Sequence, residues 1–274
     1  MFTCSTPKVT VSRQAESVAP RLLALDVGGV LVETHPIADW AQTFARHLID
    51  DARRTIPHES LLPPTERVAA DLLEGDGLHD TRKDGDSTGA ELTQAALWTM
   101  LSQPTWDADL LDHVAHNRPR LTADLCLAWE ERERRPGIPR LLDHCRNAGI
   151  ALCVVSNTVS GCAYRLVLQR AGIGDAFTSL SFSDEVGVRK PDPRLLLHGI
   201  HAAGSDPAET WYVGDTYRRD VSCGRRAGVA KTVLMRSRRT EPEPIGGPLP
   251  DLVVNDADEL LAVMQSVAGI PTPR

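Results

Sequence analysis

Short apolar runs recur along the chain, and several of them end at a polar residue. The first run, residues 22–25, ends at Asp26, and Gly28 and Gly29 then allow a tight turn. A continuous apolar run of this length is typical of a strand buried in a parallel sheet. Because a charged group is costly inside a core, we expect Asp26 at the carboxyl end of this strand. The stretch alone is equally compatible with an edge strand that ends at an aspartate.

From Pro136 onward, strand-like and helix-like segments alternate. Strands are predicted over residues 150–155, 179–183, 210–213, 232–235 and 252–254. Helices are predicted between and after them, over 138–147, 163–171, 193–203, 220–227 and 257–267. This alternation is typical of parallel strands with helices on both faces. The sequence therefore predicts an α/β fold built on a Rossmann-like parallel sheet.

Residues 35–130 have a different, mostly helical pattern. Trp40, Phe44 and Leu48 recur at helical spacing, and further helices are predicted over 90–101 and 108–115. The polar stretch 74–89 lacks apolar periodicity and is predicted to be a loop. We therefore expect a loose N-terminal arm, an α/β core and a helical domain inserted into that core, with these limits: 1–20 for the arm, 21–34 and 131–274 for the core, 35–130 for the insert.

The composition narrows the class of protein without changing the predicted fold. The 274 residues are 42% apolar and can form one large domain or a core with an insert. A net charge of −7 and a pI of about 5.7 argue against a nucleic-acid partner. No apolar run approaches a membrane span, and residues 1–20 lack the apolar segment of a secretory signal. The six cysteines show no paired metal-ligand spacing, so we expect reduced thiols in a cytoplasmic protein.

Four polar residues lie at or shortly after the ends of predicted strands: Asp26, Ser156, Lys190 and Asp215. The carboxyl ends of parallel strands share one edge of the sheet, which is where open α/β sheets bind ligands. Two carboxylates brought together there repel each other unless a cation lies between them, and Mg²⁺ fits that arrangement best. Ser156 and the backbone N–H groups of the following turn can hold phosphate oxygens.

Two further charged residues complete the predicted site. Lys190, one of four lysines against 26 arginines, adds a fixed positive charge. Asp220, five residues after Asp215, can hold a metal-bound water or orient Lys190. A carboxylate free to attack, one metal and one phosphate cradle describe phosphoryl transfer through an aspartyl-phosphate.

Four motifs in a fixed order resemble the haloacid dehalogenase superfamily of hydrolases, from about residue 21 to 267. They are LLALDVGGV at 22–30, VVSNT at 154–158, GVRKPDP at 187–193 and VGDTYRRD at 213–220. Each motif is weak alone, whereas the four together on the predicted strand ends are strong. The resemblance implies that the helical insert is the small cap of this superfamily, which closes over the substrate and excludes water.

The resemblance also implies a role for each site residue. Asp26 is the nucleophile, and Lys190 steadies both Asp26 and the phosphate. The phosphate is bound by Ser156 and Asn157. The implied metal is Mg²⁺, with these ligands and supporting residue: Asp26, the backbone carbonyl of Gly28, Asp215 and Asp220.

Gly28 departs from the pattern of the phosphatases in this superfamily. They usually carry a second aspartate there, which protonates the leaving oxygen and then activates water. Glycine still supplies the backbone carbonyl that binds the metal. It cannot provide the acid–base catalysis of the aspartate, which is typically worth about 10²- to 10⁴-fold in rate. His35 or Asp39 can replace the missing acid, although a position at the surface or at a helix start is the favoured interpretation of each.

The resulting expectation is a Mg²⁺-dependent phosphatase that acts on a small phosphorylated metabolite such as a sugar phosphate. One alternative is a catalytically impaired relative that binds a phosphorylated ligand. Another is a metal-independent 2-haloacid dehalogenase, which the acidic pattern of Gly214 to Asp220 disfavours. A phosphonate hydrolase would need a lysine in the cap, where Lys83 is better interpreted as a surface residue. Arg218 and Arg219 can contact an anionic substrate or face solvent.

Overall fold

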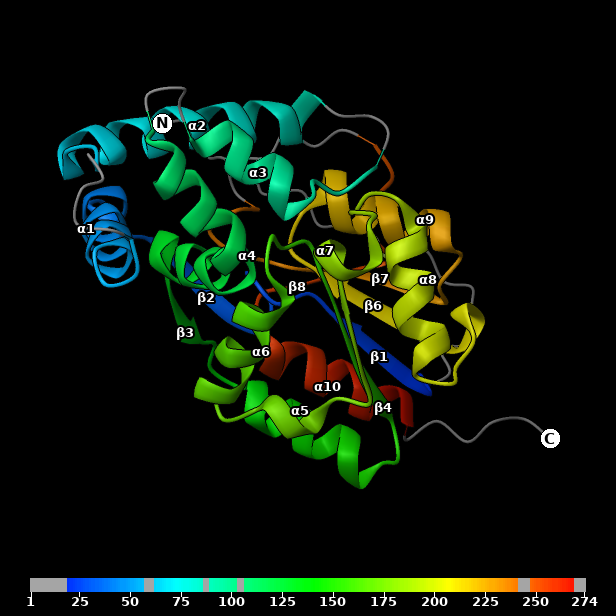
Figure 1. Cartoon of the computed structure of the whole chain (residues 1–274). Coiled ribbons are helices and arrows are strands. Elements are labelled where there is room, and N and C mark those ends of the chain that lie inside the picture. The colour runs from blue at the N-terminus through cyan, green and yellow to red at the C-terminus, as the bar shows by residue number, and fades with distance from the viewer. Residues whose placement is uncertain (1–18, 57–61, 86–88, 103–105, 241–246, 269–274) are drawn as a thin grey trace, which may run out of the picture.

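The computed structural model describes residues 19–56, 62–85, 89–102, 106–240 and 247–268, and its centre is a six-stranded parallel sheet (Figure 1). The strand order is β5-β4-β1-β6-β7-β8, with β1 central and flanked by β4 and β6. The predicted α/β fold is confirmed. The strands are β1 (Leu22–Leu25), β4 (Ala151–Ser156), β5 (Ser179–Phe182), β6 (Thr210–Gly214), β7 (Lys231–Met235) and β8 (Leu252–Val254).

Helices cover both faces of the sheet, which explains the continuous apolar runs of the strands. Leu22 and Ala24 of β1 pack in one cluster with α8 (Pro193–Ala202) and α9 (Ser222–Ala227). Leu23 and Leu25 point to the other face, into a cluster that includes α5, α6 and α10. Figure 1 shows α8 and α9 on one side of the sheet and α5 and α10 on the other. The bounds of these helices are α5 (Ile138–Asn147), α6 (Gly161–Arg170) and α10 (Ala257–Ala268).

The remaining short elements lie in the connections of the sheet. They are α7 (Ser183–Val186), two 3₁₀ turns at Gly174–Ala176 and Pro207–Glu209, and one π-helical turn at Tyr217–Val221. Asp192 caps α8, because its side chain accepts from the Arg194 N–H, and Pro193 takes the first helical position. The cap of α6 is Ser160, whose side chain accepts from the Ala163 N–H.

Among the described residues, four helices lie between β2 and β3 in the chain and pack against one another, which confirms the helical character of this region. Their bounds are α1 (Trp40–Ala52), α2 (Thr65–Gly85), α3 (Gln94–Leu101) and α4 (Ala108–Trp129). Trp98 and Trp106 are buried among them. Figure 1 shows the four helices gathered beyond one end of the parallel sheet. The division of the chain into a core and a cap domain stays a prediction.

A two-stranded antiparallel ribbon connects these helices to the sheet, and the sequence did not predict it. It pairs β2 (Val32–Pro36) with β3 (Glu130–Arg134). His35 therefore lies in a strand and does not begin a helical region. The sequence of β3, EERER, has no apolar alternation because much of the ribbon faces solvent. Such a strand leaves no hydrophobic signal to detect.

The predicted loop over residues 74–89 is wrong up to position 85, because α2 continues to Gly85. Gly75 allows close packing instead of ending the helix. A Cβ at Gly75 would lie 2.4 Å from the backbone oxygen of Met100, so α2 and α3 touch there through backbone. Helix α4 likewise continues past the predicted limit at 115 to Trp129.

Several predictions concern residues with little or no structural description. Residues 1–18 of the expected N-terminal arm, including Cys4, lie outside the described residues, as does the side chain of Lys83. The other cysteines are free thiols, buried except for Cys162. Among the described residues, no helix combines the length and apolar character needed to cross a membrane.

Candidate active site

Three of the predicted residues meet at one edge of the sheet because of its strand register. Leu25 pairs with Val154 and with Val213, so the ends of β1, β4 and β6 lie side by side. Asp26 follows β1, Ser156 ends β4 and Asp215 follows β6. All three residues are buried, with exposed fractions of 6%, 2% and 0%.

Both carboxylate oxygens of Asp26 are held in place. Oδ1 accepts from the Ser156 hydroxyl at 2.7 Å and from the Val27 N–H at 2.7 Å. Oδ2 lies 2.9 Å from the ammonium nitrogen of Lys190. The short turn after β1 thus fixes the direction of the carboxylate, and Lys190 balances its charge.

Lys190 is buried and connects two carboxylates. Its Nζ lies 2.7 Å from Oδ1 of Asp220, besides its contact with Asp26, and donates to the Val155 carbonyl at 3.2 Å. Burial alone would lower the pKa of Lys190, but the charges of Asp220 and Asp26 outweigh it and the pKa is raised. The lysine is therefore a permanent cation at neutral pH.

Asp220 accepts hydrogen bonds on both oxygens from the protein. Oδ1 accepts from the Tyr212 hydroxyl at 2.8 Å, and Oδ2 accepts from the N–H and hydroxyl of Thr216 at 3.0 and 2.5 Å. Burial would raise the pKa of Asp220, but the positive charge of Lys190 outweighs it and the pKa is lowered. Of its two anticipated roles, this geometry corresponds to orienting Lys190, and its part in a metal site stays a prediction.

Asn157 holds the loop that carries Lys190. Its side-chain amide donates to the Lys190 carbonyl at 3.0 Å and accepts from the Lys190 N–H at 2.8 Å. This reciprocal pair fixes the start of the lysine side chain. The direct phosphate contact predicted for Asn157 stays a prediction.

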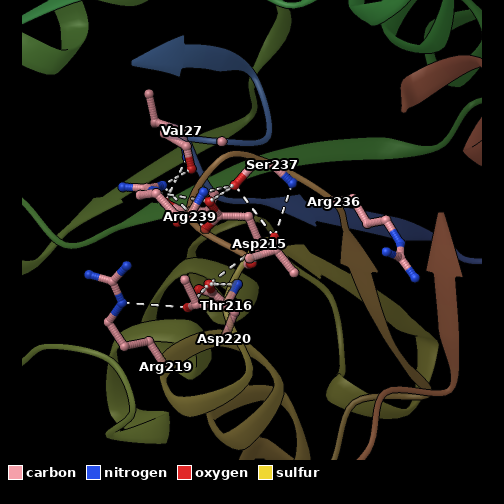
Figure 2. A network of polar contacts seen from close by, with 12 residues as sticks. Val27, Asp215, Thr216, Arg219, Asp220, Arg236, Ser237 and Arg239 are labelled. Atoms are coloured by element: carbon pink, nitrogen blue, oxygen red, sulfur yellow. Dashed lines mark hydrogen bonds and ion pairs between the residues drawn. The ribbon is translucent and has the colours of Figure 1, made fainter. Parts of the chain in front are cut away.

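Asp215 is surrounded by the loop that follows β7. Ser237 donates to its Oδ2 at 2.6 Å, and Thr240 donates to its backbone oxygen at 2.5 Å. Arg239 donates from Nε to Oδ2 at 2.9 Å and from Nη2 to Oδ1 at 3.2 Å (Figure 2). Burial raises the pKa of Asp215, the charge of Arg239 opposes that shift, and the charges of Asp220 and Asp26 add to it.

These loop residues had a signal in the sequence that was not used. Residues 237–240 follow β7 directly, and β7 is parallel to β6 in the same sheet. Its carboxyl end must therefore point to the edge that carries Asp215. The Pro, Gly and charge content of residues 236–250 indicates a loop but not its position in space.

The three acidic residues can accommodate a cation. Asp26, Asp215 and Asp220 each offer a carboxylate oxygen, and these oxygens lie within 4.8 Å of one another. One positively charged side chain already lies among these oxygens, because the Arg239 guanidinium donates to the Gly28 carbonyl as well as to Asp215. Oxygen donors of this kind suit Mg²⁺, so the residues fit the expected ion.

A cavity of about 490 Å³ adjoins the site through Asn157 and Arg239, which line it, whereas the three acidic residues do not. Its wall includes Trp40 and Trp129, and Arg219 lines it as the sequence allowed. In the described part of the chain, neither candidate for the missing acid lines it. The ring of His35 contacts Arg238 at 2.6 Å, and Asp39 is exposed at the start of α1.

Comparison with known proteins agrees with the motifs. Residues 20–228 match the haloacid dehalogenase-like hydrolases. The chain belongs to this family. It is 28% identical over 257 residues to a phosphoserine phosphatase of Thermus thermophilus, covering 88% of this chain and 97% of the relative. It is 36% identical over 210 residues to a phosphoglycolate phosphatase of Agrobacterium fabrum, covering 76% and 77%. These relatives support a hydrolase of phosphate esters.

This chain shares its fold with solved structures of both phosphatases and dehalogenases. A 2-haloacid dehalogenase from Pseudomonas syringae has a TM-score of 0.60 at 18% identity, covering 91% of this chain and 99% of that one. A phosphatase from Thermococcus onnurineus has a TM-score of 0.55 at 19% identity, covering 89% and 97%. The fold is common to both activities and does not separate them.

Proposed function

We propose that this protein is a Mg²⁺-dependent phosphatase that acts on a small phosphorylated metabolite, such as a sugar phosphate, through an aspartyl-phosphate on Asp26. The observation that carries the proposal is the buried Asp26–Lys190–Asp220 network at the common strand edge. A carboxylate with both oxygens oriented and a permanent cation beside it is suited to attack a phosphate ester. The free buried thiols agree with a cytoplasmic location.

The chemistry has two steps. A carboxylate oxygen of Asp26 attacks phosphorus, and the bond from phosphorus to the ester oxygen breaks as the leaving group departs as an alkoxide or aryl oxide, which then takes a proton from solvent. Water then attacks the same phosphorus, which releases phosphate and restores the carboxylate. Lys190 stabilises the negative charge of both the nucleophile and the phosphoryl oxygens, and Ser156 holds Asp26 in line.

The metal would be held by the Asp26 and Asp215 carboxylates and the Gly28 carbonyl, with Asp220 in support. When bound, Mg²⁺ supplies positive charge to the oxygens of the transferring group. The protein residues supply the nucleophile, orient it and keep Lys190 in position.

We expect activity toward an aryl phosphate to disappear in EDTA and to return when Mg²⁺ is added in excess. The reason is that Lys190 is shared between Asp26 and Asp220, so the phosphoryl group needs a further cation. Phosphate release is measured across a Mg²⁺ titration, with an EDTA–Mg²⁺ complex as the control for chelator effects. Full turnover in chelator would contradict the metal requirement.

We also expect kcat/KM to fall steeply as the leaving-group pKa rises, because position 28 carries no acid. The backbone of Gly28 lies outside the left-handed region, so a side chain is conformationally allowed. However, a Cβ there would lie 2.8 Å from Nη2 of Arg239, which would keep an introduced aspartate ionised. The double variant Gly28→Asp/Arg239→Gln should therefore flatten the slope more than Gly28→Asp alone.

The measurement is kcat/KM for a series of phosphate monoesters in the unaltered protein and both variants. General acid help of about 10²- to 10⁴-fold sets the scale for the poorest leaving groups. A shallow slope in the unaltered protein would show that another group supplies the proton, and His35 and Asp39 would be tested next.

A second candidate function is supported by one observation, the guanidinium of Arg239 on the expected metal ligands. A metal-independent 2-haloacid dehalogenase would need no metal ion there and no acid at position 28. Halide release from 2-chloropropionate, set against phosphate release, separates the two activities.

A further inference from the structure

We propose that the guanidinium of Arg239 and Mg²⁺ compete for the same oxygens, so that Arg239 neutralises the metal-free site and weakens metal binding. This inference rests on the metal site of the proposed function. It concerns the conditions under which Mg²⁺ can bind at that site, and not the reaction that the site catalyses.

The contacts of Arg239 coincide with the predicted metal ligands. Its Nε and Nη2 donate to the two carboxylate oxygens of Asp215, and Nη2 also donates to the Gly28 carbonyl. Mg²⁺ binds oxygens at about 2.0–2.1 Å and demands near-octahedral geometry around itself. A guanidinium on the same oxygens would repel the ion and occupy part of that shell. The two cations therefore exclude each other.

The charge distribution explains why an arginine is stable in this place. Asp26, Asp215 and Asp220 are three buried carboxylates whose oxygens lie within 4.8 Å of one another. Lys190 pairs with Asp26 and Asp220, and Arg239 pairs with Asp215. A buried carboxylate without a nearby cation is costly, so Arg239 takes the place that a metal would otherwise fill.

Gly28 is a second, independent feature that fits this arrangement. A Cβ at position 28 would lie 2.8 Å from Nη2 and 3.1 Å from Nη1 of Arg239. The guanidinium thus occupies the space beside position 28 that a side chain would need. A glycine at position 28, where related phosphatases carry an aspartate, therefore leaves the space that the Arg239 guanidinium occupies.

Arg239 can leave without unfolding its loop. The loop backbone is tied to Asp215 by Ser237, through its hydroxyl, and by Thr240, which donates to the Asp215 carbonyl. The Arg239 side chain is 34% exposed and lines the adjoining cavity, which gives the guanidinium room to move. Ser237 and Thr240 therefore keep Asp215 in place while the guanidinium withdraws.

The test is direct measurement of Mg²⁺ binding by isothermal titration calorimetry, using full-length protein freed of metal with EDTA. We compare the unaltered protein with Arg239→Gln, which removes the competing charge. The matched control is Arg238→Gln in the same loop, because Arg238 is exposed and contacts His35 instead of Asp215. If the oxygens are free in only about one molecule in ten, the apparent Kd is raised tenfold. We therefore expect Kd to fall about tenfold or more in Arg239→Gln and to stay within twofold in Arg238→Gln.

A second variant keeps the test decisive if Arg239→Gln does not fold without metal. Gly28→Ala retains Arg239 but places a methyl group against its guanidinium, so this variant should also bind Mg²⁺ more tightly. Unchanged Kd in the folded variants would overturn the competition while leaving the phosphatase proposal intact. Conversely, turnover that persists in EDTA would overturn the metal requirement, whatever the calorimetry shows.

Discussion

Asp26→Asn should reduce phosphate release by about 10⁴-fold or more while the protein stays folded. Asparagine has the same shape and can still accept from Val27 and Ser156, but its amide cannot attack phosphorus. Losing a nucleophile that acts together with its neighbours removes most of the catalysis that those residues provide. Lys190 keeps Asp220 as a partner, so the fold should survive. Activity is measured with an aryl phosphate and Mg²⁺, and folding by circular dichroism and thermal unfolding.

The control is Asp143→Asn on α5, where an exposed carboxylate pairs only with nearby Arg146 among the described residues. It should leave turnover unchanged. Deamidation of the introduced asparagine back to aspartate is checked by mass spectrometry of the Asp26→Asn variant. Substantial activity in undeamidated protein would show that Asp26 is not the nucleophile.

The fate of the water oxygen distinguishes the two candidate reactions at Asp26. An aspartyl-phosphate is hydrolysed at phosphorus, so a single turnover in H₂¹⁸O labels the phosphate and leaves Asp26 unlabelled. The ester formed by a dehalogenase is hydrolysed at the carbonyl carbon, which puts the label into Asp26. Peptide mass spectrometry after one turnover of each substrate therefore reports which bond water attacks.

The position of the strand-end residues could be predicted from the sequence because parallel strands leave little freedom. Once the runs ending at Asp26, Ser156 and Asp215 are taken as strands, their carboxyl ends must share an edge. Lys190 joins them through a loop that Asn157 holds by two hydrogen bonds. The pattern of apolar runs, and not the chemistry of the polar residues, was sufficient to predict that these residues meet.

Other parts left no comparable signal. Strand β3 is charged because the β2–β3 ribbon buries little apolar surface, and the end of α2 is polar although it is helical. Arg239 is one of 26 arginines in a loop without periodicity, so its contact with Asp215 depends on the path of that loop in space. Contacts of this kind depend on loop geometry, which neither spacing nor hydrophobicity encodes.

Lys190→Met should lower the free energy of unfolding by about 3–5 kcal/mol at pH 7, because it leaves two buried carboxylates without their cation. Those carboxylates are Asp26 and Asp220, at 2.9 and 2.7 Å from the ammonium nitrogen. Methionine has a similar length and fills the space, so the charge is the main change. The control, Lys231→Met, removes a lysine that lies over the ring of Trp211 and should cost less than about 1 kcal/mol. Urea unfolding measures both.

The pH dependence of this loss separates a charge effect from a packing effect. In the unaltered protein the pKa of Asp220 is lowered and that of Lys190 is raised. The stabilisation by Asp220 is therefore present above its ordinary pKa of about 3.9 and is lost as the pH falls below that value. Lys190 stays charged throughout this range. Without Lys190, burial and the neighbouring carboxylates favour protonated Asp220. Lowering the pH should therefore remove the unpaired buried charge and reduce the loss of stability in Lys190→Met. The difference in unfolding free energy should shrink between pH 7 and about pH 4.

A double variant tests the same cause at constant pH. Lys190→Met/Asp220→Asn removes both charges, and the amide oxygen of the introduced asparagine can still accept from the N–H and hydroxyl of Thr216, while its NH₂ group faces the Tyr212 hydroxyl, which would have to turn and accept. It should recover part of the stability that Lys190→Met loses, since the penalty comes from an unpaired buried charge rather than from a missing contact. A loss that is the same at pH 4 and pH 7, and that Asp220→Asn does not reduce, would mean that Lys190 stabilises the fold by packing. Its charge would then have no structural role, and stabilising the phosphoryl group would be the remaining reason for a buried lysine beside Asp26.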